Sequence, residues 1–213
     1  MRRHQLAAAA FVILLTAGCA TSSRTRVPGL WNNSSRAKAL IRGSDMVGAN
    51  LAGMDLSGLD LSAANMPNAN MRRADLRGAL MVGVKLQGAN LEDADLRSVD
   101  IRSADLQGAN LRNVRLGRAS LDRDPATMQF AKMRRATLVG ADLTDAVMTG
   151  AILADADLRG ATLIGANLSG VDLSTADTSG ADFTDARYDS RTVFPPRFNA
   201  KAAGMIRTAR DAR

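Results

Sequence analysis

Large aliphatic residues return at every fifth position along most of the chain. Between residues 88 and 111, these repeat centres are Leu91, Leu96, Ile101, Leu106 and Leu111. The residue two positions before each centre is nearly always alanine, and most other positions are polar. On an α-helix, five residues turn about 500°, which spreads the centres around the cylinder, and in a straight strand an odd period alternates their faces. The pattern therefore predicts a short extended piece followed by a turn, once every five residues.

A longer period indicates how many turns close one coil. The tripeptides GAN and NAN recur every 20 residues, which is four repeats. Their asparagines are predicted to stack about 4.8 Å apart as a core ladder of amides. The members of this ladder are Asn50, Asn70, Asn90 and Asn110. The chain is therefore predicted to be a four-sided solenoid of about seven coils.

Pentapeptides such as ADLRG, ANLED, ADLQG, ANLRN, ADLTD and ANLSG resemble the A(D/N)LXX pattern of the pentapeptide-repeat family. The resemblance covers residues 39–190. It implies an all-β fold, a right-handed quadrilateral β-helix in which the centre and the alanine point inward.

Both ends of such a solenoid need a cap, because an open coil exposes unpaired strand edges. The segment YDSRTVFPPRFNAKAAGM is similar to the segment that closes many members of the family. Asn199 is expected to cap a short C-terminal helix, whose Ala203 and Ile206 seal the last coil. Leu30 and Trp31 are the corresponding candidates at the first coil.

The repeats fall into two arrays, residues 39–123 and residues 124–190, followed by a cap and basic tail at 191–213. Leu121 and Met128 are seven residues apart instead of five, which predicts a two-residue insertion near Pro125. A water-facing irregular corner and a recognition element are the two interpretations of this insertion.

The N-terminus predicts export. Residues 1–18 contain Arg2 and Arg3, an apolar run from residue 6 to 15 and then small residues, which is typical of a secretory signal peptide. LLTAGC resembles the lipobox of bacterial lipoproteins, although Thr16 stands where that motif most often has leucine. The resemblance implies cleavage between Gly18 and Cys19 and attachment of diacylglycerol to Cys19.

The segment that follows is predicted to connect this lipid to the repeats. Residues 19–38 comprise the lipidated cysteine and a Ser/Thr/Asn-rich tether, whose flexible part spans about 25 Å. Ala20 after the cysteine implies retention in the outer membrane, facing the periplasm. A secreted or periplasmic protein without the lipid is the alternative.

The charge does not indicate nucleic-acid binding. The chain has a formal charge of +7, but residues 39–190 carry 16 basic and 20 acidic residues, so the body is net −4. The basic excess lies in the two ends. Aromatic residues are only 3% of the chain, while apolar residues are 46%, so the core must be built from small aliphatic side chains.

The sequence contains few candidate catalytic residues. The only histidine is His4, and the only cysteine is Cys19. Histidine- and cysteine-based catalytic and zinc sites are thus excluded from the mature repeat body, and no enzyme, metal or cofactor is predicted. A cluster of cations near the insertion is the one candidate interaction patch. It could bind an acidic polymer, lipid headgroups or an acidic partner. The alternative interpretation is a solvated surface of mixed charge without a ligand. Its members are Arg112, Arg115, Arg118, Arg123, Lys132, Arg134 and Arg135.

The sequence therefore predicts a non-catalytic, lipid-anchored repeat protein of the bacterial envelope. It would act as a rigid scaffold or protein-interaction surface, as a monomer or an end-to-end dimer. Some members of the family mimic duplex DNA and bind type II topoisomerases, and this is the alternative function if the protein is cytoplasmic.

Overall fold

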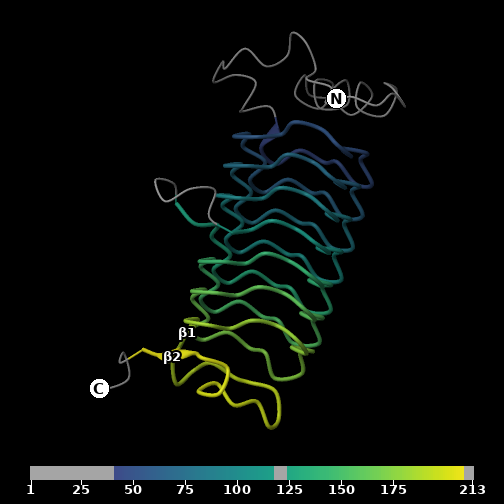
Figure 1. The fold of residues 1–213 in the computed structure, drawn as a ribbon. Coiled ribbons are helices and arrows are strands. Elements are labelled where there is room, and N and C mark those ends of the chain that lie inside the picture. Colours follow the sequence, from purple (N-terminus) through teal and green to yellow (C-terminus); the bar gives the residue numbers. More distant parts are fainter. Residues whose placement is uncertain (1–40, 118–123, 209–213) are drawn as a thin grey trace.

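The computed structural model describes residues 41–117 and 124–208, which form a rod of stacked coils (Figure 1). The predicted signal peptide, Cys19 and the tether lie outside the described residues. Each five-residue repeat contributes one bridge residue, which pairs in parallel with the residue 20 positions later, as Asn70 does with Asn90. One coil therefore consists of four repeats, and each repeat forms one side.

The corners are β-turns that contain a left-handed residue. In the repeat centred on Leu91, the Ala94 amide donates to the Leu91 carbonyl oxygen at 3.0 Å, and Asp93 has φ 59°. A type II turn requires positive φ at this third position, which glycine, asparagine and aspartate tolerate best. This requirement explains why those residues recur two positions after the centres.

Hydrogen bonds between coils satisfy the backbone on both sides of each bridge. Asn90 donates its amide to the Ala69 carbonyl oxygen of the preceding coil at 2.9 Å, and Leu91 donates to Asn110 of the following coil at 2.7 Å. This scheme repeats from coil to coil and pairs most backbone groups of the described ladders.

The centres and the alanines fill the interior. In the middle of the rod, Leu91, Ala94, Ala104 and Leu106 are all 0% exposed. Small alanine side chains allow the coil to be narrow, and the leucines then stack in contact along its axis. The result is one continuous apolar column, as the inward assignment of these positions predicts.

The four sides are numbered here in the order in which the chain passes them, and each is defined by the bridge residues that it stacks. Side 1 includes Leu80 and Asp100, side 2 Lys85 and Asp105, side 3 Asn90 and Asn110, and side 4 Asp95 and Arg115. The turn after each centre forms the corner to the next side. Sides 2 and 4 therefore face in opposite directions.

The stacking register shifts by seven residues at one corner, and by a single residue near the C-terminal end, where Asp172 pairs with Val193, 21 residues later. Bridge partners are 20 residues apart as far as Asp95 and Arg115, 27 residues apart at Asp100 and Thr127, and again 20 apart at Thr127 and Val147. The seven extra residues lie at the corner between sides 4 and 1. The stacks continue on both sides of this corner.

The register gives an insertion of seven residues, in place of the two that the sequence indicates. Leu116 and Met128 are consecutive centres, so the chain between them is seven residues longer than one repeat. The sequence pattern identifies Leu121 as a repeat centre because it lies five residues after Leu116. Leu121 lies outside the described residues, and the position in the stack that it was expected to fill is occupied by Met128.

The C-terminal end closes with two short strands, β1 (Arg187–Tyr188) and β2 (Ile206–Arg207), which pair in parallel. The capping helix predicted here is wrong, because residues 199–204 form turns. The Asn199 side chain does accept a hydrogen bond from the Ala202 amide at 3.0 Å. Gly204, with φ 74°, then redirects the chain after a single turn so that β2 can pair.

Aromatic side chains cover the last coil. Phe183 and Phe198 meet edge to face with ring centroids 5.2 Å apart, and Phe194 stacks on Phe198 at 4.9 Å. Met205 is 8% exposed, whereas Ile206, which was expected to seal the coil, is 48% exposed. The end of the rod is therefore covered by rings and Met205.

Candidate interaction surfaces

The outward side chains of the repeat body form its candidate interaction surfaces. Residues 41–117 and 124–208 include neither histidine nor cysteine, and no three of their carboxylates are grouped so as to hold a metal ion. No helix within these ranges is both long and apolar enough to cross a membrane. The candidates for function are therefore the outward residues of the four sides.

The cations predicted to form one patch are distributed over several faces. Arg115 is a bridge residue on side 4, and Lys132 is a bridge residue on the opposite side 2. Arg112 lies at the corner between sides 3 and 4, whereas Arg134 and Arg135 lie between sides 2 and 3. Neighbours in sequence are separated in space because the chain changes side every five residues.

The remaining members of the cluster differ in their partners. Arg118 and Arg123 lie outside the described residues. Arg134 is paired, with its Nη1 3.1 Å from Asp155 Oδ2. Within the described residues, no carboxylate lies within ion-pair distance of Lys132 or Arg135. Side 2 and its corner therefore retain two cations available to a partner.

The asparagine ladder lies on the outside of side 3. Asn70 Nδ2 donates to Asn50 Oδ1 at 3.1 Å, and Asn110 Nδ2 donates to Asn90 Oδ1 at 3.2 Å. The predicted stacking of these asparagines is confirmed, but their placement in the core is wrong. In an extended segment, the residue between two inward side chains has to point outward.

A shallow groove of about 570 Å³ runs along side 4. Its charged lining includes Asp75 and Asp95, each of which forms a two-point ion pair with the arginine two residues later. Arg77 donates its Nε and Nη2 to Asp75 at 2.8 and 2.6 Å, and Arg97 contacts Asp95 at the same distances. The hydrogen bond and the charge of Asp75 raise the pKa of Arg77. The arginines of the groove therefore neutralise most of the charge of its carboxylates.

Hydroxyl groups take the place of arginines in the last coils. Asp177 accepts a hydrogen bond from Ser179 Oγ at 2.6 Å, and Asp182 accepts one from Thr184 Oγ1 at 2.6 Å. These hydrogen bonds, together with those from the same residues' amides, lower the pKa of both carboxyl groups. These acids help to hold their own turns.

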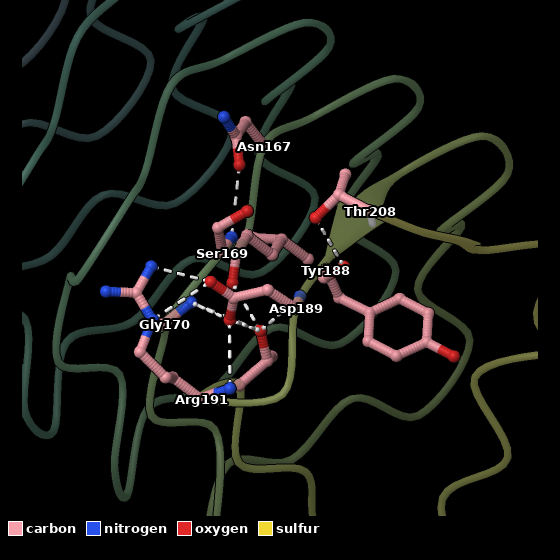
Figure 2. Close-up of polar contacts among 9 residues, drawn as sticks. Asn167, Ser169, Gly170, Tyr188, Asp189, Arg191 and Thr208 are labelled. Atoms are coloured by element: carbon pink, nitrogen blue, oxygen red, sulfur yellow. Dashed lines mark hydrogen bonds and ion pairs between the residues drawn. The ribbon is translucent and has the colours of Figure 1, made fainter. Parts of the chain in front are cut away.

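Asp189 is the most buried charged residue of the described ranges, at 3% exposure. Figure 2 shows its carboxylate between Gly170 and Arg191. Oδ1 accepts from the amides of Gly170 at 2.9 Å and Arg191 at 3.0 Å, and Oδ2 accepts from the Arg191 guanidinium at 2.6 and 3.0 Å. Asp189 also donates its own amide to Thr192 Oγ1 at 3.1 Å.

The surroundings of Asp189 favour its ionised form. Burial raises its pKa, but the hydrogen bonds from Arg191 and Gly170 and the charge of Arg191 outweigh burial, so the pKa lies below its ordinary value. Sequence reasoning did not select this residue. The available signal was its Asp-x-Arg spacing, shared with Asp75 and Arg77, directly after the final repeat centre.

Phe130 was also missed. It is 65% exposed and has φ 58°, at a turn position that elsewhere on this corner is occupied by small residues. A Cβ placed on Gly150, the equivalent residue of the next coil, would lie only 2.7 Å from the Phe130 ring. The large side chain at this position, just after the insertion, is the signal that could have identified it.

The stacked bridges and the inward Ala and Leu ladders define a β-helical solenoid built from five-residue units. The chain belongs to the pentapeptide-repeat family: the family description, pentapeptide repeats in 8 copies, matches residues 44–81, 79–118, 126–163 and 151–187. A comparison with curated proteins gives no match.

Solved structures of pentapeptide-repeat proteins resemble the chain. Full-length QnrB1, a plasmid-mediated fluoroquinolone resistance protein, is 19% identical, with 81% of this chain and 88% of that chain covered and a TM-score of 0.51. HetL, a pentapeptide repeat protein involved in heterocyst differentiation regulation from the cyanobacterium Nostoc sp. strain PCC 7120, is 25% identical, with coverage of 76% and 80% and a TM-score of 0.31. The QnrB1 likeness concerns the fold alone.

Proposed function

We propose that this protein is a non-catalytic, lipid-anchored rod of the bacterial envelope that presents its outward side chains as a scaffold or protein-interaction surface. The observation that supports this function is the continuous ladder of bridges from Asp45 to Val193. Each coil fixes the positions of the outward residues while leaving their identity open. Such a surface suits recognition of an extended or repetitive partner.

The proposed location rests on the N-terminal sequence. Residues 1–18 have the layout of a secretory signal, and LLTAGC matches the lipobox apart from Thr16. Lipid attached at Cys19 would hold the rod on the outer membrane, facing the periplasm. Without the lipid, the same signal would give a secreted or periplasmic protein.

The proposed partner is another envelope protein or an acidic polymer, and no nucleic acid is expected. The repeat body is close to electroneutral, and in the groove on side 4 the Arg77 and Arg97 guanidinium groups neutralise their neighbouring carboxylates. A mimic of duplex DNA needs a continuous acidic surface. The rod is expected to be a monomer or an end-to-end dimer, with contact through an end of the solenoid.

Cell fractionation tests the anchor. Wild-type protein should sediment with the outer membrane and incorporate labelled fatty acid, whereas Cys19→Ala protein should do neither. Thr16→Leu is the matched control, since it improves the lipobox and should leave the location unchanged. Sedimentation of the Cys19→Ala protein with the outer membrane would contradict the lipid anchor. Wild-type protein in the cytoplasm would favour topoisomerase binding instead.

Crosslinking in living cells, with mass-spectrometric identification of the neighbours, tests the scaffold role. Photo-reactive residues at exposed positions of sides 2 and 4 should capture a small, reproducible set of envelope components. Equal labelling of unrelated proteins from every side would argue against a specific surface.

A further inference from the structure

Side 2 carries cations and an exposed aliphatic residue, and an exposed aromatic ring lies at its corner with side 1. Phe130 and Lys132 belong to one coil, while Gly150 and Ile152 occupy the equivalent positions of the next. Phe130 is 65% exposed and Ile152 is 38% exposed. The Phe130 ring lies against Gly150, and Lys132 is bridged to Ile152, so these residues form one small continuous surface, called here the Phe130 surface.

The fold does not require a phenylalanine at position 130. At the equivalent turn position, other coils have glycine or another small residue with positive φ: Gly43, Ala63, Gly83, Ser103, Gly150 and Gly170. A phenylalanine forced into the left-handed region costs free energy that glycine avoids. Because this ring is also largely exposed, it returns little of that cost through burial in the core.

Side 2 also carries cations that form no ion pair with the described carboxylates. Within the described residues, neither Lys85 nor Lys132 on side 2, nor Arg135 at its far corner, has a carboxylate within ion-pair distance. Three acids lie on or beside the same surface, and each accepts hydrogen bonds. Asp172, the bridge partner of Ile152, accepts from the Ser174 amide at 3.0 Å. Asp105 accepts hydrogen bonds from Gln87 and Gln107, and Asp155 accepts from Arg134 and Thr175.

We propose that the Phe130 surface is a second membrane contact, which lays side 2 of the rod on a bilayer rich in anionic lipid. Apolar side chains beside lysine and arginine match the boundary between acyl chains and anionic headgroups. The ring and Ile152 would enter the headgroup region, while Lys132 and Arg135 would contact phosphates.

The predicted tether is long enough for this arrangement, which rests on the proposed lipid anchor for the nearness of the membrane. The coil of Met128 is four coils from that of Ile41, or about 19 Å along the rod. A flexible tether of residues 20–38 spans about 25 Å. A rod lying on its side can therefore keep both the lipid and the Phe130 surface in contact with one bilayer.

Tryptophan fluorescence tests the contact without the lipid. The full chain with Cys19→Ala and Trp31→Phe carries no other tryptophan, so Phe130→Trp introduces a single probe at the surface. With vesicles of phosphatidylglycerol and phosphatidylcholine in equal parts, its emission should move to shorter wavelength and be quenched by brominated acyl chains. Val139→Trp, at the diagonally opposite corner of the same coil, is the matched control and should show neither change.

Charge substitutions test the role of the cations. Lys132→Gln and Arg135→Gln, measured by vesicle sedimentation, should each lower the partition coefficient about fivefold, and high salt should do the same. Thermal melting should remain unchanged, because neither side chain contributes an ion pair to the rod.

Several outcomes would overturn the assignment. These are an unchanged Phe130→Trp spectrum on anionic vesicles, an equal response from Val139→Trp, and equal binding to pure phosphatidylcholine vesicles. A response to polyglutamate in solution, with none to vesicles, would assign the surface to an acidic polymer instead. Because Cys19 is absent from these variants, the result is independent of whether fractionation supports the lipid anchor.

Discussion

Gly150 and Gly170 occupy the same corner in consecutive coils, but their amides have different partners. Gly150 donates to the backbone carbonyl oxygen of Ser169 at 2.9 Å, whereas Gly170 donates to the side chain of Asp189, also at 2.9 Å. Within the rod, the next coil supplies the acceptor. In the last coil, whose corner between Arg187 and Val193 is one residue longer, side chains supply it instead: Asp189 Oδ1 at 2.9 Å and Thr192 Oγ1 at 3.2 Å.

The middle and the C-terminal end of the rod are therefore specified by the sequence in two different ways. The interior is specified by many equivalent residues, each of which contacts mainly the coils on either side. The end is specified by residues that occur once, such as Asp189 and the stacked Phe194 and Phe198. Substitutions in the two regions should therefore differ in size and in what else they disturb.

The largest effect is expected inside the rod. Leu106→Ala removes a fully buried side chain between two other coils, and should lower the free energy of unfolding by about 2–5 kcal/mol. Met205→Ala should cost less, because Met205 lies at the end of the rod and is 8% exposed, whereas Leu106 is 0% exposed. Urea unfolding of both variants measures the difference, and equal losses would remove this distinction between middle and end.

Asp189→Ala should lower the free energy of unfolding by about 1–3 kcal/mol, because it removes the buried carboxylate that accepts from the Gly170 and Arg191 amides and leaves Gly170 only the longer bond to Thr192 Oγ1 at 3.2 Å. Asp182→Ala is the matched control, since its exposed carboxylate contacts only the adjacent turn at Thr184. The control should change stability little. Loss of protection of the Gly170 amide from hydrogen exchange, in Asp189→Ala alone, would identify the missing acceptor.

The same carboxylate predicts a pH dependence. The folded-state pKa of Asp189 lies below its ordinary value, so its contribution to stability is present above about pH 4 and is lost as the pH falls further. Thermal melting of wild type between neutral pH and pH 2 should show this loss. The Asp189→Ala variant should lose less over the same range, and parallel curves would assign the acid sensitivity to other carboxyl groups.

The smallest effect is expected at the exposed corner. Phe130→Gly should raise the free energy of unfolding by about 1 kcal/mol, because glycine adopts positive φ without strain. Gly150→Ala should be less destabilising in that background than in wild type, since the Phe130 ring no longer opposes the added methyl group. A double-mutant cycle in chemical denaturation measures this coupling, and additive effects would show that the ring is free to move away.

The sequence is sufficient to predict most of the repeating structure. The five-residue period, the inward Ala94 and Leu91 and the 20-residue recurrence of Asn70 and Asn90 follow from periodicity and strand geometry alone. These features are repeated many times, so an error at one repeat does not change the prediction. The asparagines were nevertheless assigned to the core, although alternation places them outside.

Features that occur once were predicted poorly. Leu121 has the spacing of a centre, and only the pairing of Thr127 with Asp100 reveals that it is not one. Asn199 has the side chain of a helix cap, but β-pairing of Ile206 limits the helix to a turn. The basic cluster was judged from distance along the sequence, which places Arg115 and Lys132 close together although the coil separates them.

The seven-residue insertion keeps the rotational phase of the rod, because it lies at a corner and the next centre, Met128, still stacks where a centre is needed. Removing one complete repeat elsewhere would have the opposite consequence. Every downstream residue would advance by a quarter turn, and Lys132 would no longer share a face with Lys85. A corner of this rod can therefore be lengthened by any number of residues without rotating the surfaces beyond it. Repeats, in contrast, must be added or removed four at a time, as one complete coil, if the surfaces are to keep their directions.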